Sequence, residues 1–454
     1  MQSTSTIYRA SFFLICIIFI TSVSAQENSP YSRFGLGDFT YSQHVVTKAM
    51  GGVAVAYADG QIVNFSNPAS YANLKIVTYD LGVTIDSRTL RSNTPVSKYN
   101  STNFSPTYLS VGFPIDKMKN IGASFGFRPI TRINYSVVKS ERLSSVSSND
   151  SIQTGFEGSG GMNQFYFGLG KKWKNGLSIG FNSGYNFGKR ESNTKRAFIN
   201  DTVAFYKSNY STTTSFGGMF VSGGFQFETL LDSSKGYRKG MKDKYYLRLG
   251  ANASLGQKLN ASQNISKETY EYDNSGGIFK VDSVFSSSNN KGSITIPTTY
   301  TAGALIQKTA SDASGVYDIW TFGAEFTTAK WSEYRFYNQA DALINTWQVR
   351  VGGSWVPDPK SFDNYFSRIN YKAGFNFGKD YINADGKELK TYGVSFGLGL
   401  PVRPARFSYQ FTTIHTAFEY GKRGSAVNNI TENYFKLSFA LSISDIWFIK
   451  RKYD

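Results

Sequence analysis

The chain has 454 residues, a formal net charge of +17 and a single cysteine, Cys16. Aromatic residues make up 16% of the chain and glycine numbers 43, yet the mean hydropathy is only -0.31. One cysteine excludes a disulfide framework, and basic residues that are scattered without an Arg-rich arm argue against a nucleic-acid partner.

The first residues indicate export. Arg9 is the only charge ahead of an apolar run at 11–20, and small residues follow at 23–25. This pattern is typical of a signal peptide, so we expect residues 1–25 to be removed by cleavage after Ala25. The alternative is a membrane anchor, but the apolar run is about half the roughly 20 residues that a spanning helix needs.

Residues 26–75 precede the first clear strand and are rich in glycine and other small residues. A segment of about fifty residues is too small for a stable separate domain and long for a tail. We therefore expect it to fold into the lumen of a barrel as a plug or hatch. A flexible periplasmic arm is the alternative.

From about Thr78 onward the sequence alternates with a period of two. In 177–188, for example, Leu177, Ile179 and Phe181 share one face, while Ser178 and Gly180 share the other. Such alternation predicts strands with one apolar and one small or polar face. Fourteen candidates are centred on residues 78–88, 103–114, 121–137, 162–173, 177–188, 213–230, 245–260, 294–308, 317–330, 346–356, 369–380, 390–400, 405–420 and 432–447.

Alternation alone also fits a soluble sandwich, so the connections decide between the two folds. Residues 114–120, 174–176 and 401–404 are short, whereas 138–161, 189–212 and 261–293 are long and polar. Short turns at one rim and long loops at the other are typical of outer-membrane barrels. The predicted fold is all-β: a transmembrane antiparallel β-barrel of about 14 strands, formed by residues 76–454 in the cell outer membrane, with an N-terminal plug in its lumen.

Several charged residues share strand faces with Gly, Ser and Asn. Arg or Lys facing lipid at mid-membrane would each cost about 2–4 kcal/mol, so these side chains are expected to face the lumen. They would anchor the plug and the head group of an anionic ligand, or they are ordinary solvated lumen residues. The set is Arg128, Arg248, Glu325, Arg350, Lys372 and Lys436.

The third candidate strand carries Gly126 and Pro129 close together. Both residue types weaken a ladder, because glycine removes packing and proline removes an N–H donor. We predict a kink here that opens the wall sideways into lipid. Alternatively, Gly126 makes room for the plug and Pro129 marks where the strand leaves the membrane.

No residues form a pattern for catalysis, cofactor binding or metal binding. His44 and His415 are the only histidines and have no cysteine or paired carboxylate beside them in the sequence. We expect a protein that is not an enzyme and needs no cofactor.

The plug segment and the C-terminal half together carry a family resemblance. The run from Lys48 to Ala56, which includes Gly51 and Gly52, is followed by Asn67-Pro68-Ala69. With 350–353, 355–358, 371–374 and 419–421, these residues resemble the long-chain fatty acid and hydrophobic compound transporters of the outer membrane (FadL/TodX type). Residues 29–38 and 445–448 resemble members from the Bacteroidetes.

The resemblance implies a lumenal hatch built on Gly51, Gly52, Asn67, Pro68 and Ala69, and passive uptake of hydrophobic molecules such as fatty acids or aromatics. The alternative is a non-transporting barrel that serves protein secretion, adhesion or surface reception. Expected partners are outer-membrane lipid and lipopolysaccharide, a hydrophobic ligand and the barrel-assembly machinery. The protein is expected to be a monomer.

Overall fold

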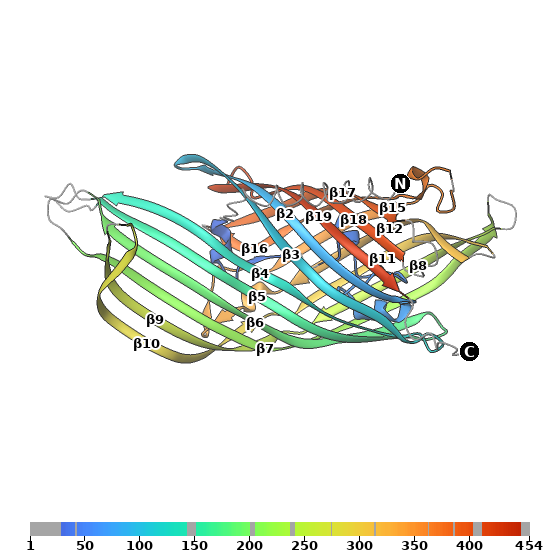
Figure 1. The fold of residues 1–454 in the computed structure, drawn as a ribbon, viewed down its shortest axis with the longest axis horizontal. Coiled ribbons are helices and arrows are strands. Elements are labelled where there is room, and N and C mark those ends of the chain that lie inside the picture. Colours follow the sequence, from blue (N-terminus) through green and yellow to red (C-terminus); the bar gives the residue numbers. More distant parts are fainter. Residues whose placement is uncertain are drawn as a thin grey trace, which may run out of the picture.

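The computed structural model describes residues 29–40, 43–142, 151–199, 205–236, 241–273, 275–312, 315–361, 363–384, 386–402 and 411–445. Their strands form one antiparallel sheet that closes into a barrel, because β19 (Ile430–Asp445) pairs along its length with β2 (Val77–Asn93). The predicted fold class, a closed barrel with 14 wall strands, is confirmed (Figure 1). The expected signal peptide lies outside the described residues.

The wall follows chain order and is built of long strands. After β2 it contains β3 (Val96–Asp116), β4 (Ile121–Arg142), β5 (Ser151–Lys172), β6 (Leu177–Phe198), β7 (Lys207–Lys235), β8 (Lys242–Ser254), β9 (Gln257–Tyr272), β10 (Ile278–Ile296), β11 (Thr299–Asp312), β12 (Gly315–Ala329), β15 (Thr346–Trp355), β16 (Asn370–Ala384), β17 (Lys387–Val402), β18 (Phe411–Arg423) and β19. Two wall strands are interrupted, since β8 continues as β9 and β10 continues as β11. The second interruption falls at Pro297, which has no N–H to donate to a ladder.

Shorter elements lie outside this sequence of wall strands. They are η1 (Pro30–Arg33), β1 (Asp38–Phe39), α2 (Val45–Ala49), η2 (Pro68–Asn73), η3 (Trp331–Glu333), β13 (Arg335–Phe336), β14 (Gln339–Ala340) and η4 (Phe366–Arg368). None of the helices in the described ranges is long and apolar enough to cross a membrane.

The two faces of the wall differ as the alternation predicts. On β6, Phe181 and Tyr185 are exposed on the outside, while Asn182 and Asn186 are buried on the inside. Large outward side chains among small inward ones are what a lipid-facing wall with a filled lumen requires. The same parity places Trp347, Val349 and Trp355 on the outside of β15.

The outward-facing side chains change from apolar to polar or charged part-way along six strands. On β6 the aromatic series ends at Phe187 and continues with Lys189 and Glu191, and on β5 Phe165 gives way to Glu157. Charged side chains on the lipid-facing side are costly, so this change marks the edge of the apolar band. We call the part beyond it the rim extension: residues 133–142, 151–160, 189–198, 207–215, 260–272 and 278–292 of β4, β5, β6, β7, β9 and β10.

The rim extension corrects one expectation. Residues 138–161, 189–212 and 261–293 were expected to be irregular loops, but strands run through most of each range. Their Ser, Thr and Asn residues are spaced with the same period of two, and a strand with water on its outer face needs no lipid-facing aromatics. In Figure 1 these strands project well beyond the rest of the barrel on the left.

The N-terminal region lies inside the barrel. Its side chains from Val45 to Tyr57 and from Val63 to Phe65 are almost all buried. A second buried core lies nearer the rim extension, where Tyr31 and Leu36 pack with Phe216, Leu259 and Tyr334. The lumen is therefore occupied by residues 29–40 and 43–75, and the wall strands begin at Val77. We call residues 43–75 the plug.

Candidate functional site

The wall is shaped to receive the backbone of the plug. Inward-facing glycines lie so close to plug backbone atoms that an added Cβ would come within 3.0 Å of them. At Gly250, for example, a Cβ would overlap the carbonyl oxygen of Val55. Small inward residues therefore create space for backbone contact, a role that alternation alone does not reveal. The glycines in such contacts are Gly122, Gly170, Gly180, Gly250, Gly352 and Gly374.

Gly51 and Gly52 form the turn that follows α2. Both have positive φ, +70° and +91°, a conformation that favours glycine. The Gly51 amide donates to Ser395 Oγ at 2.8 Å, and Gln43 Nε2 donates to the Gly52 carbonyl at 3.0 Å. A Cβ at Gly52 would also meet the side chain of Arg350.

Asn67, Pro68 and Ala69 begin η2. Asn67 Oδ1 accepts a bond from the Ala69 amide, and its Nδ2 donates to the carbonyls of Val55 at 2.6 Å and Phe225 at 3.1 Å. The triplet thus ties one plug segment to another and to the wall, shortly before the chain enters β2.

The six charged residues that we expected to face the lumen all lie on inward faces, and several contact the plug. Glu325 Oε2 accepts from the amides of Ala54 and Val55, each at 2.7 Å, and its Oε1 accepts from Arg350 at 2.6 Å. Arg248 donates to the carbonyl of Ala58 at 3.2 Å.

The other three differ in their surroundings. The Arg128 guanidinium lies 5.0 Å from the centroid of the Phe65 ring. Lys436 approaches Asp86 at 3.9 Å, and Lys372 donates to the neighbouring carbonyl of Asn370 at 3.3 Å. These two are buried in the wall next to the plug.

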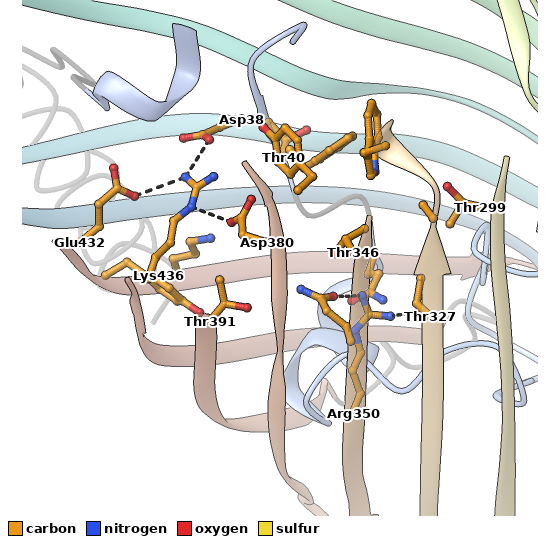
Figure 2. A pocket seen from close by; sticks show the side chains of 18 of the residues that line it. Asp38, Thr40, Thr299, Thr327, Thr346, Arg350, Asp380, Thr391, Glu432 and Lys436 are labelled. Atoms are coloured by element: carbon orange, nitrogen blue, oxygen red, sulfur yellow. Dashed lines mark hydrogen bonds and ion pairs between the residues drawn. The ribbon is translucent and has the colours of Figure 1, made fainter. Parts of the chain in front are cut away.

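A cluster of buried ion pairs holds the segment ahead of the plug, and no local sequence pattern predicts this cluster. Asp38 in β1 pairs with Arg423 at 2.8 Å and with Arg88 at 3.0 Å. Figure 2 shows Asp38, Asp380 and Glu432 converging on one guanidinium, that of Arg423. These ion pairs tie the segment that contains Asp38 to β2 and β18.

The ladder between β3 and β4 is incomplete. It runs from Asp116–Ile121 to Leu109–Phe127 and ends there, although both strands continue for many residues. Pro106 on β3 and Pro129 on β4 lie just beyond the last pair, and neither has an N–H to donate. Opposite Pro129, the β4–β5 register also shifts by one residue. The wall therefore has a break between β3 and β4 that begins next to Pro129.

Gly126 lies on the paired side of this break, opposite Ser110. A Cβ there would meet the carbonyl of Leu109 and the ring of Tyr166. Gly126 thus makes room for the close approach of β3 and of an inward tyrosine, whereas the unpaired stretch of β4 starts after Phe127.

The free edge of β4 is covered by residues 29–40 of the same chain. β1 pairs with it antiparallel, Asp38 opposite Arg132 and Phe39 opposite Thr131. The Thr40 amide donates to the Ile130 carbonyl at 3.0 Å, and the Ser29 amide donates to the Asn134 carbonyl at 3.2 Å. We call residues 29–40 the edge segment. It takes the place that β3 leaves, as a strand added to an open sheet edge.

A cavity of about 310 Å³ lies beside the edge segment. Its lining combines the ion cluster with hydroxyl groups such as Thr327, Thr346 and Thr391 (Figure 2). Phe39, Trp331 and Tyr381 form an aromatic group along its wall, with centroids 5.1–5.4 Å apart. The cavity therefore offers both charged and aromatic surface.

The two histidines, His44 of the plug and His415 of the wall strand β18, lie close to each other. His44 Nε2 lies 3.4 Å from Asp80 Oδ1, and the His44 and His415 ring centroids are 5.8 Å apart. Within the described ranges, no group of three or more His, Cys, Asp or Glu is placed to hold a metal ion. His44 also caps α2 by accepting from the Val46 amide, which is a structural role.

Two solved structures share the fold. A Pseudomonas aeruginosa FadL homologue is 12% identical, with a TM-score of 0.52, and the match covers 91% of this chain and 100% of that one. A structure described as the CymD monoaromatic hydrocarbon channel is 13% identical, with a TM-score of 0.50, covering 91% and 99%. At these identities the likeness concerns the fold alone.

The family assignment rests on a different comparison. No curated protein matches the sequence. The model of the family described as BamG, however, matches residues 7–454. Because this match spans almost the whole chain, the protein belongs to the BamG family.

Proposed function

We propose that this protein is an outer-membrane channel through which hydrophobic small molecules pass sideways between the lumen and the lipid. The observation that carries the proposal is the break in the wall between β3 and β4. The fold shared with the FadL homologue and the hydrocarbon channel supports it. In this proposal residues 1–25 are a signal peptide, 26–75 a plug, and the rim with the turns at 117–120 and 173–176 faces the periplasm.

A straight path along the barrel axis is poorly suited to such a molecule. The plug backbone touches the wall through inward glycines on several strands, and charged groups such as Glu325 bind it. An apolar molecule gains roughly 25 cal/mol for each Å² that it removes from water, and lipid offers that gain directly outside the wall. A lateral exit is therefore favoured over transit through a polar interior.

The edge segment is the closure of this exit. Its bonds to β4 replace those that β3 does not make, and its Asp38 is held by two arginines, Arg88 of β2 and Arg423 of β18, which belong to the β3 side of the break. The adjoining cavity, with its aromatic group and its cations, would accept an amphiphile with an anionic head. Uptake then requires the edge segment to leave β4, at least locally.

A reversible cross-link tests this mechanism. Phe39 and Thr131 are directly opposite in the β1–β4 pair, and opposite residues of an antiparallel pair have Cα separations suited to a disulfide. The variant Phe39→Cys/Thr131→Cys, in a Cys16→Ser background, is reconstituted into liposomes with labelled oleate or toluene outside. We expect oxidation to stop uptake and reduction to restore it.

The two single-cysteine variants are the matched controls. Their rate of uptake should be the same before and after oxidation. Uptake that continues through the oxidised, cross-linked barrel would show that the exit lies elsewhere. Failure of the unmodified protein to take up any of these probes would refute the channel itself.

The second candidate is a barrel that serves protein secretion or barrel assembly. Membership of the BamG family and the rim extension favour it, because a channel for small molecules does not need a sheet that projects from the membrane. It predicts no saturable uptake in the liposome assay.

A further inference from the structure

Cations lie on the outer face of the wall at the edge of the apolar band. Successive pairings join four residues of β6, β7, β9 and β10 into one rung: Lys189, Ser215, Ser262 and Lys291. Lys189 is the first outward residue beyond Phe187, where the apolar series of β6 ends. Lys291 faces the same side, because paired residues point to one side of a sheet. Both lysines therefore begin at the depth where lipid tails give way to polar head groups.

Two more cations lie on the same face, two rungs nearer the centre of the membrane. Lys258 of β9 is opposite Thr295 of β10, and Thr295 is opposite Arg335 of β13. Lys258 points outward because its neighbour Leu259 is buried in the core inside the barrel, and Arg335 points outward because Phe336 packs against that core. The long stems of such side chains extend along apolar surface and bring the charge to the head groups.

The nearest carboxylates on the outer face of the strands are already paired. Glu191, one rung farther from the membrane than Lys189, binds that lysine. Glu157, on the next rung, pairs with Lys195 at 2.8 Å. The carboxylates of β5 and β6 are therefore engaged on their own strands and do not neutralise the cations of β9, β10 and β13.

The acids near β13 have other partners as well. Glu333 lies beside Lys330 at 4.0 Å, and Asp341 accepts the Gly35 amide at 2.7 Å. The Arg335 guanidinium donates to two backbone carbonyls and to no carboxylate in the described ranges. Within those ranges, the cations of β9, β10 and β13 form no ion pair. The patch thus carries a positive charge that the chain does not balance.

Small polar side chains form the surface between these cations. Adjacent strands are about 4.8 Å apart, so the three spacings from β6 to β10 separate Lys189 from Lys291 by about 14 Å. Ser215 and Ser262 lie between them, and Asn260 lies one rung nearer the membrane. Hydroxyl and amide groups both donate and accept, so this surface can bind the hydroxyl and amide groups of a sugar.

Apolar side chains lie next to this surface on its membrane side. Tyr185 and Met219 are opposite each other in the β6–β7 pair, and their exposed fractions are 49% and 68%. From the centre of the membrane outward, the wall presents first apolar, then small polar and cationic groups. A lipid with acyl chains below and a phosphorylated sugar above has the same order.

We propose that this outer face, from Lys189 on β6 to Arg335 on β13, binds the phosphorylated lipid A of lipopolysaccharide. The phosphates would pair with Lys258, Lys291 and Arg335, and the acyl chains would lie on Met219. The position selects a lipid, because lipid covers the aromatic wall next to the patch, and the cations select an anionic head group. The proposal rests on the orientation proposed above, in which the rim extension faces the outside of the cell, and not on the channel function.

Native mass spectrometry tests the site with the full mature chain, purified in detergent free of lipopolysaccharide. Phosphorylated lipid A, the same lipid A after removal of its phosphates, and phosphatidylglycerol are titrated separately. We expect saturable binding of phosphorylated lipid A, with a Kd lower than that of either other lipid by about ten-fold or more.

Variants of the strands supply the matched comparison. Lys258→Gln/Lys291→Gln should weaken binding of phosphorylated lipid A by about ten-fold or more, whereas Lys258→Arg/Lys291→Arg should keep the Kd within about two-fold. Lys195→Gln/Lys280→Gln removes the same charge from the outer face farther from the membrane and should also leave the Kd within about two-fold. All variants are first shown to be folded by their mobility on unheated gels.

Several results would overturn the proposal. Absence of saturable binding, or equal affinity for lipid A without phosphates or for phosphatidylglycerol, would show that the patch does not recognise a phosphorylated sugar. Equal losses in the two glutamine pairs would show that net charge, and not this patch, attracts the lipid.

The orientation is checked separately. In a Cys16→Ser background, Lys280→Cys should react with a membrane-impermeant maleimide on intact cells. Reaction only after the outer membrane is permeabilised would place the rim extension in the periplasm and overturn the proposal. None of these results bears on uptake by liposomes, so the lipid A site and the channel can fail separately.

Discussion

Replacing Glu325 by glutamine should increase local opening of the plug at Ala54 and Val55 and leave the stability of the wall strands unchanged. The carboxylate accepts two plug amides, from Ala54 and Val55, and also binds Arg350. Glutamine has one acceptor oxygen and an NH₂ group, so it can serve the plug or the arginine but not both. Hydrogen bonds to charged groups contribute about 1.5–3 kcal/mol each, so the loss of one or two is about 3 kcal/mol. That corresponds to a roughly hundred-fold increase in the population of the opened segment.

Hydrogen exchange measured by mass spectrometry reports this opening directly. In Glu325→Gln the peptide that contains Ala54 and Val55 should exchange roughly a hundred-fold faster, while peptides of the wall strands stay unchanged. Glu191→Gln, which removes a carboxylate from the outer face, is the control and should leave plug exchange unaltered. If exchange at Ala54 and Val55 changes less than about three-fold in the folded variant, Glu325 does not hold the plug.

Three further outcomes follow from the same contacts. Asp38→Ala should free the edge segment from both arginines and make it sensitive to protease added to intact cells, and continued resistance would show that the β4 pairing suffices. Gly250→Val should displace the backbone at Val55 and lower the midpoint of thermal unfolding, whereas Gly223→Val, at a position with open space, should not; equal shifts would contradict the close-contact reading. Val349→Arg should impair membrane assembly far more than Gln348→Arg, and equal tolerance would mean that the assumed register of β15 is wrong by one residue.

The channel proposal concerns the part of the wall at the edge of the apolar band. The break between β3 and β4 begins there, beside Pro129, with the edge segment paired to β4 across it and the cavity beside that segment.

The sequence by itself determined the barrel. A period of two sustained over more than a dozen segments requires a sheet with two unlike faces, and one face of large apolar residues requires lipid. The inward positions of Arg128, Arg248, Glu325, Arg350, Lys372 and Lys436 follow from the same parity, because a strand leaves only two directions for each side chain. The lack of that period in residues 26–75 also predicts a segment ahead of the first strand that is not part of the wall.

Only the tertiary structure decided what these residues contact. Asp38 and Arg423 are 385 residues apart, and nothing in a local pattern pairs an acid near the N-terminus with an arginine on the penultimate strand. The break beside Pro129 depends on the ladder that β3 does not complete, which is a property of two strands and not of one. Local periodicity fixes which way a side chain points, but its partners are set by closure of the sheet and by the path of the plug within it.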